Sequence, residues 1–360
     1  MIYEPKIAIH PGRHIARLLD ELGVNQSWLS ERAGVSKKLI SQVINGEALI
    51  SPDLAVSLEN VFGMSAEFWS NLNSNYLTIK SKLDRTQKAK EEAILYRDNI
   101  FSSFYNKLAK SGYVEATKKG YIRVLNLQRF FGINSLDHIE TTQSAAFRTA
   151  KNKNYDKYAM AAWLRCGEIK RNEIKLEQYD EKKFRASIPR IKTVIYDMPK
   201  NFWEELVSIF AESGVALVAV KHLDKTYASG VARWIGQNPM IMLSDRGKRD
   251  DKIWFTLFHE IGHIILKHGK NESFIELDEG MEKTKKEQDA DKYAAENLIS
   301  ESSYLSFVDE VVPVISKEEI VKFANHEKIP VGVIVGRLQH DGFVPYSMFN
   351  DLKKTIYISD

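Results

Sequence analysis

Apolar side chains recur every three or four residues through most of this 360-residue chain, which is the spacing of amphipathic helices. In residues 1–77 the pattern comes in short segments that end at glycine. The first segment is Ile15–Leu22, and Gly23 ends it. We expect five short helices here, with the second over Gln26–Ala33 and the third over Lys37–Asn45.

The last third of the chain has a different pattern, which adds β-strands to the helices. Val215–Val220 is a short apolar run rich in valine and is predicted to be a strand. Ala228–Ile235 and Met240–Ser244 are two further predicted strands, and the turn between them indicates a hairpin. A helix follows from about Asp250 to Lys267. Its apolar residues occupy most of its sides, which is typical of a core helix.

These patterns divide the chain into four parts and predict a mainly α-helical fold with a small β-sheet. We expect a bundle of short helices over 1–77, a helical connector over 78–194, an α+β domain over 195–300 and a helical extension over 301–360 that packs on it. The hydrophobic share of 44% and the charged share of 28% are ordinary for a globular chain, so disordered and collagen-like proteins are excluded.

Two features of the composition bear on location. No apolar run approaches about 20 residues, so we expect no membrane-spanning helix and no membrane partner. Cys166 is the only cysteine, which leaves neither an internal disulfide nor a cysteine-rich zinc site available. Together with a start that lacks a secretory pattern, the single thiol predicts a cytoplasmic location.

Charge is unevenly distributed, although the whole chain carries only +3. Residues 1–77 hold 6 basic and 8 acidic side chains, a net charge of −2, and residues 201–360 hold 19 and 26, a net charge of −7. Residues 78–200 hold 26 basic and 14 acidic side chains, a net charge of +12. Such a segment attracts the phosphate backbone of nucleic acids, but a lysine-rich solvated surface is an equally good interpretation.

The second and third predicted helices are joined by a short turn at Gly34-Val35, and Ser36 is a good N-cap for the third. This is the helix-turn-helix arrangement, in which the second of the two helices enters the major groove of DNA. The side chains placed to meet base edges are Lys37, Lys38, Ser41, Gln42 and Asn45. From the pattern alone, a five-helix bundle that binds no DNA is nearly as good an interpretation.

The stretch from Ile9 to Trp69 resembles the helix-turn-helix domain of HigA-like antitoxins. The resemblance rests on His10-Pro11-Gly12, Gly34-Val35-Ser36, Asn45-Gly46 and Phe68-Trp69, and it covers nearly all of the N-terminal segment. It implies a homodimeric domain that binds operator DNA, and it raises the possibility of a toxin as protein partner.

The predicted core helix of the last third carries His259-Glu260-Ile261-Gly262-His263, an H-E-x-x-H motif. Histidines four residues apart share one face of a helix, so both imidazoles can reach one metal ion. Glu260 lies beside the first of them, where a carboxylate can act as a general base. The alternative is a buried core helix whose histidines are satisfied by backbone or carboxylate partners.

A catalytic zinc site needs a third protein ligand. Glu287 lies 24 residues after His263 on another predicted helix, and Asp291 shares its face, where it can accept a hydrogen bond from a ligand imidazole. Asp289 points elsewhere on an ideal helix and is the weaker candidate. His268 lies nearly one and a half turns after His263, so we expect it to face away from the metal as a surface residue.

The residues from Ala228 to Gly269, together with Glu287–Ser300, resemble the ImmA/IrrE family of zinc metallopeptidases. The family pairs H-E-x-x-H with a later E-x-x-A-N/D-x-F-A pattern, which this chain matches at Glu287, Ala290, Asp291 and Ala294, with Tyr293 in place of Phe. The resemblance covers about 195–300, with a weaker continuation over Ile329–Gly342. It implies a zincin-like domain.

By the same resemblance, His259, His263 and Glu287 are the Zn²⁺ ligands and Glu260 is the general base.

The sequence therefore predicts a DNA-binding transcriptional regulator with a zinc-dependent endopeptidase domain. The family resemblance implies that the substrate is a helix-turn-helix repressor, which is either a separate partner or this chain itself. The alternative is an antitoxin-like repressor of a toxin–antitoxin module, whose metallopeptidase-like domain only binds a partner or a signal.

Overall fold

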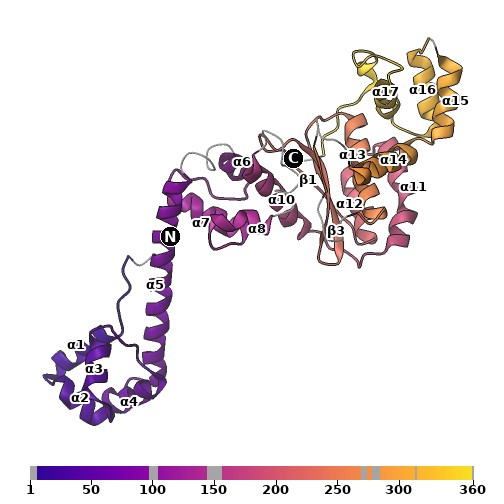
Figure 1. Cartoon of the computed structure of the whole chain (residues 1–360). Helices are drawn as coiled ribbons and strands as arrows, with labels where there is room; N and C mark the ends of the chain where they lie inside the picture. The colour runs from indigo at the N-terminus through magenta and orange to yellow at the C-terminus, as the bar shows by residue number, and fades with distance from the viewer. Residues whose placement is uncertain are drawn as a thin grey trace. The chain divides into compact units, whose positions relative to one another are not determined.

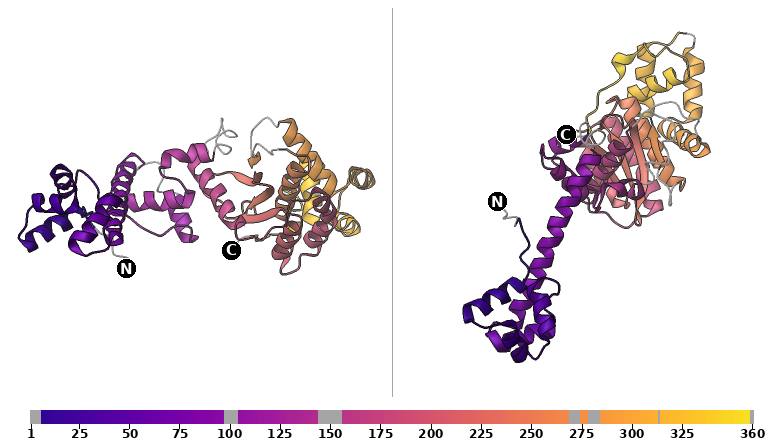
Figure 2. Two further views of the ribbon diagram at one scale, coloured as in Figure 1. Left: turned by 90° about the horizontal axis from the view of Figure 1, so that it is seen from below. Right: turned by 60° about the vertical axis from the view of Figure 1, so that its left-hand side comes forward.

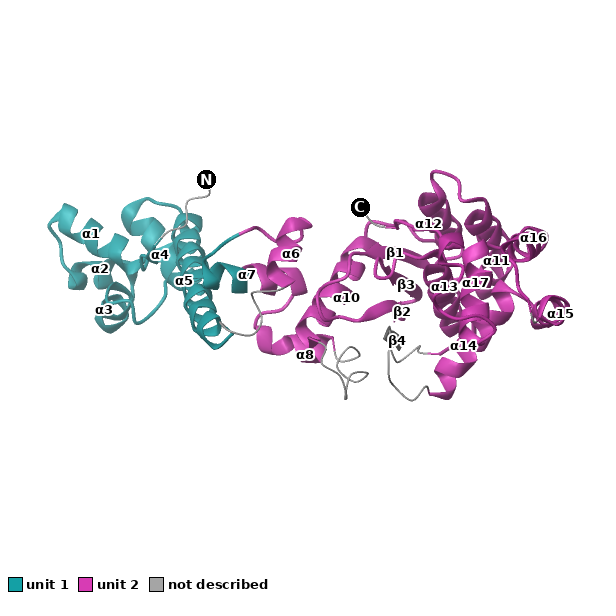
Figure 3. Ribbon diagram, turned by 90° about the horizontal axis from the view of Figure 1, so that it is seen from above, with its two compact units in different colours: residues 1–97, 117–125 teal, residues 98–116, 126–360 magenta. Residues whose placement is uncertain are grey.

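The computed structural model describes residues 6–96, 104–143, 156–268, 284–312 and 314–358, and the main chain of 274–277. The chain forms two compact units, one of residues 1–97 and 117–125 and the other of residues 98–116 and 126–360 (Figure 3). The predicted class, mainly helical with a small sheet, is confirmed. Within the described residues, no helix has the length and apolar character needed to cross a bilayer.

The first unit begins with four short helices and one long helix. They are α1 Gly12–Leu22, α2 Gln26–Ala33, α3 Lys37–Ile44, α4 Pro52–Phe62 and α5 Ala66–Leu95. Four of the five start behind an Asn or Ser whose side chain accepts a backbone N–H, and α1, α2 and α4 end at a glycine in the left-handed conformation. The order of polar caps and glycines therefore sets these boundaries.

Helix α5 extends from the bundle of α1–α4 (Figure 2). Its 30 residues correspond to about 45 Å at 1.5 Å per residue. No glycine or proline interrupts Ala66–Leu95, so the segment around Trp69 and the charged stretch Lys80–Glu92 form one continuous helix. The division predicted at residue 77 lies inside this helix, and only its beginning, with Trp69, belongs to the core of the bundle.

The middle of the chain is helical, and part of it belongs to the core of the second unit. Its helices are α6 Phe104–Lys110, α7 Gly120–Phe131, η1 Leu136–His138, α8 Ile139–Thr142, α10 Lys157–Arg171, α11 Glu181–Asp197 and α12 Phe202–Glu212. In α10, Trp163 is fully buried and its indole N–H donates to the carbonyl of Val220. Helix α11 packs into the main core of the second unit through Phe184 and Ile191.

The sheet of the second unit has the strand order β1-β3-β2-β4. Its strands are β1 Ala216–Val220, β2 Ala228–Ile235, β3 Asn238–Ser244 and β4 Phe274–Leu277. Strands β2 and β3 form the predicted antiparallel hairpin, β4 pairs antiparallel with β2, and β1 pairs parallel with β3. Helix α10 lies on one face of the sheet and α12 and α13 on the other, so β1 and β3 are buried on both sides (Figure 1).

Five helical elements complete the second unit: α13 Asp250–Ile265, α14 Lys285–Leu298, α15 Glu301–Val311, α16 Lys317–Glu327 and α17 Val331–His340. A short turn of 3₁₀ helix, η2 Asn350–Leu352, follows. The C-terminal segment is fixed to the start of α13, because the Lys353 ammonium donates to Asp251 and the Asp250 N–H donates to the carbonyl of Lys354. Gly332 of α17 lies against the Asp250 carboxylate, where a larger residue would clash.

Candidate metal centre and DNA-contacting helix

Helix α13 presents His259 and His263 on one face, and each is only 1% exposed. Their Nε2 atoms are 3.0 Å apart, as expected for residues one helical turn apart whose rings turn the same way. Apolar side chains of the helix itself, among them Trp254, Leu257 and Phe258, anchor it in the main core of the second unit. The two imidazoles therefore lie in a rigid and largely dry environment.

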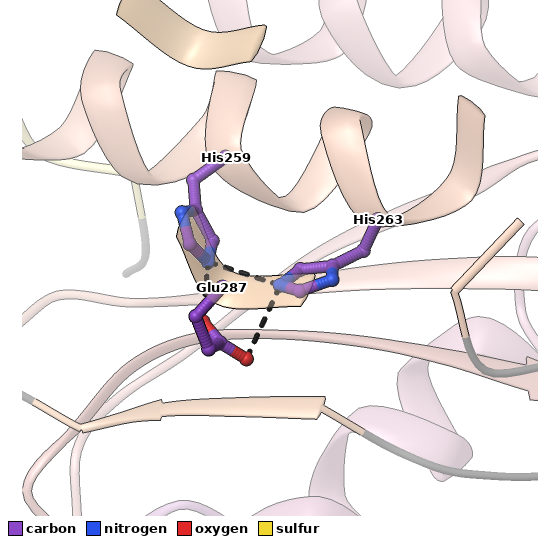
Figure 4. A group of neighbouring side chains, drawn as sticks. All are labelled: His259, His263 and Glu287. Atoms are coloured by element: carbon purple, nitrogen blue, oxygen red, sulfur yellow. Dashed lines mark hydrogen bonds and ion pairs between the residues drawn. The ribbon is translucent and has the colours of Figure 1, made fainter. Parts of the chain in front are cut away.

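Glu287 of α14 completes a group of three (Figure 4). Its Oε2 lies 3.0 Å from Nε2 of His259, and its Oε1 lies 3.5 Å from Nε2 of His263. Ligand atoms of a tetrahedral ion with bonds of about 2.0–2.1 Å stand about 3.3 Å apart. The two Nε2 atoms and the Glu287 carboxylate, which faces each histidine with a different oxygen, therefore form a triangle of about the size that one face of a tetrahedral metal site requires.

Small residues allow α13 and α14 to approach closely enough for this contact. A Cβ at Gly262, inside the H-E-x-x-H motif, would lie 3.1 Å from Cδ1 of Tyr293 and 3.3 Å from Cα of Ala290. Ala290 and Ala294 are fully buried on the facing side of α14. The glycine of the motif and the alanines of the second helix are thus the reason that Glu287 reaches the histidines.

Asp291, one turn after Glu287, accepts a hydrogen bond from His259. Its Oδ1 lies 2.9 Å from Nδ1 of His259, the ring nitrogen that does not face Glu287. A neutral imidazole carries one hydrogen, and this contact places it on Nδ1. Nε2 of His259 is then left with a free electron pair directed at the ligand triangle.

The expectation that His268 is a surface residue is wrong, because it is half-buried against His263, although it lies on the side of that ring away from Glu287. Its Nδ1 lies 3.2 Å from Nδ1 of His263. Helix α13 ends at Ile265, and Lys267 adopts a left-handed conformation with φ of 58°. The His268 N–H then donates to the carbonyl of His263, which brings the chain back over the last turn. Counting turns of an ideal helix fails because the helix has already ended.

Burial and hydrogen bonding set the protonation states of the ligand groups. Burial lowers the pKa of His263, although the neighbouring Glu287 opposes this. Burial raises the pKa of Glu287, but the adjacent His259 and His263 outweigh it and bring the pKa to about 2. A neutral imidazole and an ionised carboxylate are the forms that bind a metal ion, so the donor set is suited to one.

Glu260 is fully buried between α13 and the sheet. A Cβ at Gly230 of β2 would lie 2.6 Å from Oε1 of Glu260 and 2.6 Å from Cγ2 of Thr256. The glycine therefore provides the space that the carboxylate occupies. Glu260 follows the first ligand directly in the chain and is not one of the three grouped ligand residues.

In the first unit, α3 has an apolar inner side and a polar outer side. Ile40 and Val43 are fully buried, whereas Lys37, Lys38 and Asn45 are exposed. Ser41 and Gln42 are half-buried, and the Asn45 amide donates to the hydroxyl of Ser41 over 3.4 Å.

Gly12 of α1 lies against the C-terminal end of α3, where a Cβ on Gly12 would be 1.8 Å from the Val43 carbonyl oxygen. The predicted base-contacting side chains thus gather on the outer side of a helix that is held tightly from within.

Two family profiles match the chain, a helix-turn-helix profile over residues 15–69 and an IrrE N-terminal-like domain profile over residues 211–338. Virulence-associated protein A of Dichelobacter nodosus is 33% identical over 69 residues, which are 19% of this chain and 68% of that protein. The uncharacterized HTH-type transcriptional regulator YddM of Escherichia coli is 32% identical over 71 residues, which are 19% of this chain and 76% of that protein.

The chain belongs to the helix-turn-helix regulators. Its C-terminal part is an IrrE-like domain of the ImmA/IrrE metallopeptidase family, so both predicted resemblances are confirmed. The IrrE-like match continues past α14 to residue 338, in α17.

Solved structures with similarity to the helix-turn-helix domain cover about a quarter of this chain. An addiction module antidote protein of the HigA family from Coxiella burnetii is 27% identical to this chain and has a TM-score of 0.23. The match spans 24% of this chain and 94% of the Coxiella burnetii chain. Antitoxin HigA of Pseudomonas aeruginosa, solved with the higBA promoter, is 28% identical and has a TM-score of 0.22. The match spans 22% of this chain and 89% of the HigA chain.

In the IrrE-like domain the structure brings His259, His263, Glu287 and Asp291 together and leaves Asp289 exposed. Sequence reasoning missed two residues that shape the site, Gly230 and His268. An isolated glycine in a predicted strand is a known sign of close approach by another group, so Gly230 carried a signal. His268 carried none, because its position depends on where α13 ends.

Proposed function

We propose that this regulator binds operator DNA through α3 and that its IrrE-like domain is a zinc-dependent endopeptidase. The observation that carries the peptidase is the triangle of His259, His263 and Glu287, together with the buried Glu260 that follows His259 in the chain. Two imidazoles and one carboxylate, with a fourth position open, are the ligand set of catalytic zinc sites in peptidases. When bound, zinc supplies Lewis-acid activation of water and of the peptide carbonyl.

The protein's own residues have separate tasks in this proposal. Asp291 accepts the Nδ1 hydrogen of His259 and so keeps Nε2 of His259 free of hydrogen. The pKa of Glu287 is lowered to about 2, so its carboxylate is ionised at neutral pH. Glu260 takes the proton of the attacking water and passes it to the leaving amine. The surrounding apolar side chains of α13 exclude bulk water, which strengthens these electrostatic interactions.

The substrate that we propose is a helix-turn-helix repressor, either a partner protein or this chain. The test compares the intact mass of wild type and Glu260→Gln, each loaded with zinc and incubated alone or with the candidate repressor. Cleavage by wild type alone, with equal zinc content in both proteins, supports the peptidase. Fragments that appear equally with Glu260→Gln refute it, because the proton carrier would then be dispensable.

DNA binding through α3 is tested separately. Lys38→Glu and Gln42→Ala change the outer side of α3 without touching Ile40 or Val43, so the fold should survive. We expect both variants to lose affinity for a promoter fragment in a mobility-shift assay, and Glu260→Gln to keep it. Retained affinity in both variants would move the contact surface away from α3. Light scattering on the same samples tests the proposed homodimer.

The second candidate function is an antitoxin-like repressor without turnover, which acts in the cytoplasm and binds a toxin or a signal. The close packing of α3 against Gly12 favours the antitoxin-like function, because Gly12 belongs to the His10-Pro11-Gly12 element in which this chain resembles HigA-like antitoxins. Under this function, Glu260→Gln regulates its promoter as wild type does. A regulatory defect in that variant would instead require chemistry.

A further inference from the structure

The outer ring nitrogen of His263 has a partner that lies outside the H-E-x-x-H motif. Nδ1 of His263 is 3.2 Å from Nδ1 of His268, whereas Nε2 of His263 faces Glu287. We propose that His268 is a positioning residue for His263, which accepts the Nδ1 hydrogen and so keeps Nε2 ready to bind the metal. This inference rests on the proposed metal site and adds a residue outside its ligand set.

The tautomer of His263 decides whether it can be a ligand. A neutral imidazole carries its hydrogen on one nitrogen, and a metal binds only the nitrogen that lacks it. Metal binding at Nε2 therefore requires a hydrogen on Nδ1, and a buried N–H requires an acceptor. The Nδ1 atom of His268 lies within reach to accept it. If the hydrogen bond ran the other way, His263 would carry its hydrogen on Nε2 and could not bind the ion.

The main chain holds this acceptor in place. The His268 N–H donates to the carbonyl of His263 over 2.9 Å, and Lys267 supplies the left-handed turn between them. The two rings stand edge to face, with centroids 5.3 Å apart and an interplanar angle of 62°. Because the turn fixes the backbone of His268, less of the residue has to be ordered when the metal binds.

His268 is therefore placed as an orienting partner rather than as a fourth ligand. Its Nδ1 approaches the nitrogen of His263 that is directed away from the triangle. The arrangement parallels that of His259, whose outer nitrogen is held by Asp291. One ligand is thus oriented by a carboxylate from α14 and the other by an imidazole from the turn after α13. Such partners typically contribute 10- to 100-fold to metal affinity.

The experiment measures zinc affinity of the full-length protein by competition with a chromophoric chelator. His268→Ala removes the acceptor, His268→Asn keeps a polar atom near the position of Nδ1, and His268→Gln places one near the position of Nε2. We expect zinc to bind about 10- to 100-fold more weakly to His268→Ala and His268→Gln, and within about threefold of wild type to His268→Asn. The matched control is His326→Ala, because the His326 side chain is 80% exposed and far along the chain from the site.

A second measurement reports on geometry. Cobalt substituted for zinc should give the visible spectrum of a tetrahedral site in wild type and His268→Asn, with a changed spectrum in His268→Ala.

The outcomes separate this inference from the proposed metal site. Wild-type affinity in His268→Ala overturns the positioning role and leaves the metal site intact. Equal weakening in all three His268 variants also overturns it, because His268 would then act through packing alone. A wild-type protein that takes up no zinc refutes the metal site itself, and the positioning role with it.

Discussion

Gly12→Ala tests how α3, the proposed DNA-contacting helix, is held in the first unit. A Cβ at this position would lie 1.8 Å from the Val43 carbonyl oxygen, 2.7 Å from the Val43 carbonyl carbon and 2.9 Å from Cα of Ile44. All three are main-chain atoms at the end of α3, so rotation of a side chain cannot relieve the contact. The added methyl group must therefore push α1 and α3 apart.

The size of the effect follows from the distance. Ordinary van der Waals contact begins at 3.4 Å, so the separation must grow by about 1.6 Å from 1.8 Å. Overpacking of a well-packed core typically costs about 1–3 kcal/mol, and a displaced backbone belongs at the upper end of that range. A cost of about 3 kcal/mol raises the population of locally opened α3 about 150-fold.

Hydrogen exchange read by mass spectrometry measures this opening in the full-length chain. We expect the amides of α3 to exchange about 100-fold faster in Gly12→Ala, whereas those of α13, in the other unit, keep their rate. Affinity for a promoter fragment should fall in parallel. The matched control is Arg13→Ala, whose exposed side chain should leave α3 unchanged. Unaltered protection of α3 in Gly12→Ala would refute the reasoning.

Three further predictions concern the second unit. Gly230→Ala should displace the neighbouring carboxylate of Glu260 and reduce peptide hydrolysis about 100-fold, while the zinc content stays at the wild-type level. Loss of zinc from this variant would contradict the prediction. Burial raises the pKa of Asp250 from 3.8 to about 6, so folding takes up a proton in this window and stability falls as the pH rises through it. Asp250→Asn should therefore raise the free energy of unfolding at pH 8 by up to about 3 kcal/mol, and so raise the thermal midpoint, with a much smaller effect at pH 4. An equal effect at pH 8 and pH 4 would exclude titration of Asp250 as the cause. Lys353→Met leaves the largely buried Asp251 without its cation and should cost about 3 kcal/mol in a denaturant titration. Lys317→Met breaks an exposed pair and should cost less than about 1 kcal/mol.

Local signals predicted the parts of this protein that depend on near neighbours in the chain. The helix-turn-helix was readable because Ser36 and Gly34 set helix boundaries within a few residues of themselves. The spacing of His259 and His263 was readable because one helical turn fixes their relative position. The same local reasoning placed the predicted division at residue 77, where the chain has no residue that ends a helix, and α5 continues to Leu95.

Contacts between segments that are distant in the sequence depended on packing. The spacing of residues identified Glu287 and Asp291 as candidates, but the approach of α14 to Gly262 creates the distances of 3.0 and 2.9 Å to His259. The space for Glu260 depends on Gly230 in a strand 30 residues earlier, and no pattern along α13 contains it.

The physical reason for this difference is the range over which each determinant acts. Caps, glycines and helical periodicity act over one turn and are written in consecutive residues, so the chain order is enough to read them. The orientation of a side chain in a site depends on the end of its helix and on the volume of neighbours from other elements. His268 shows both effects, because a single left-handed residue after α13 turns an expected surface histidine toward His263.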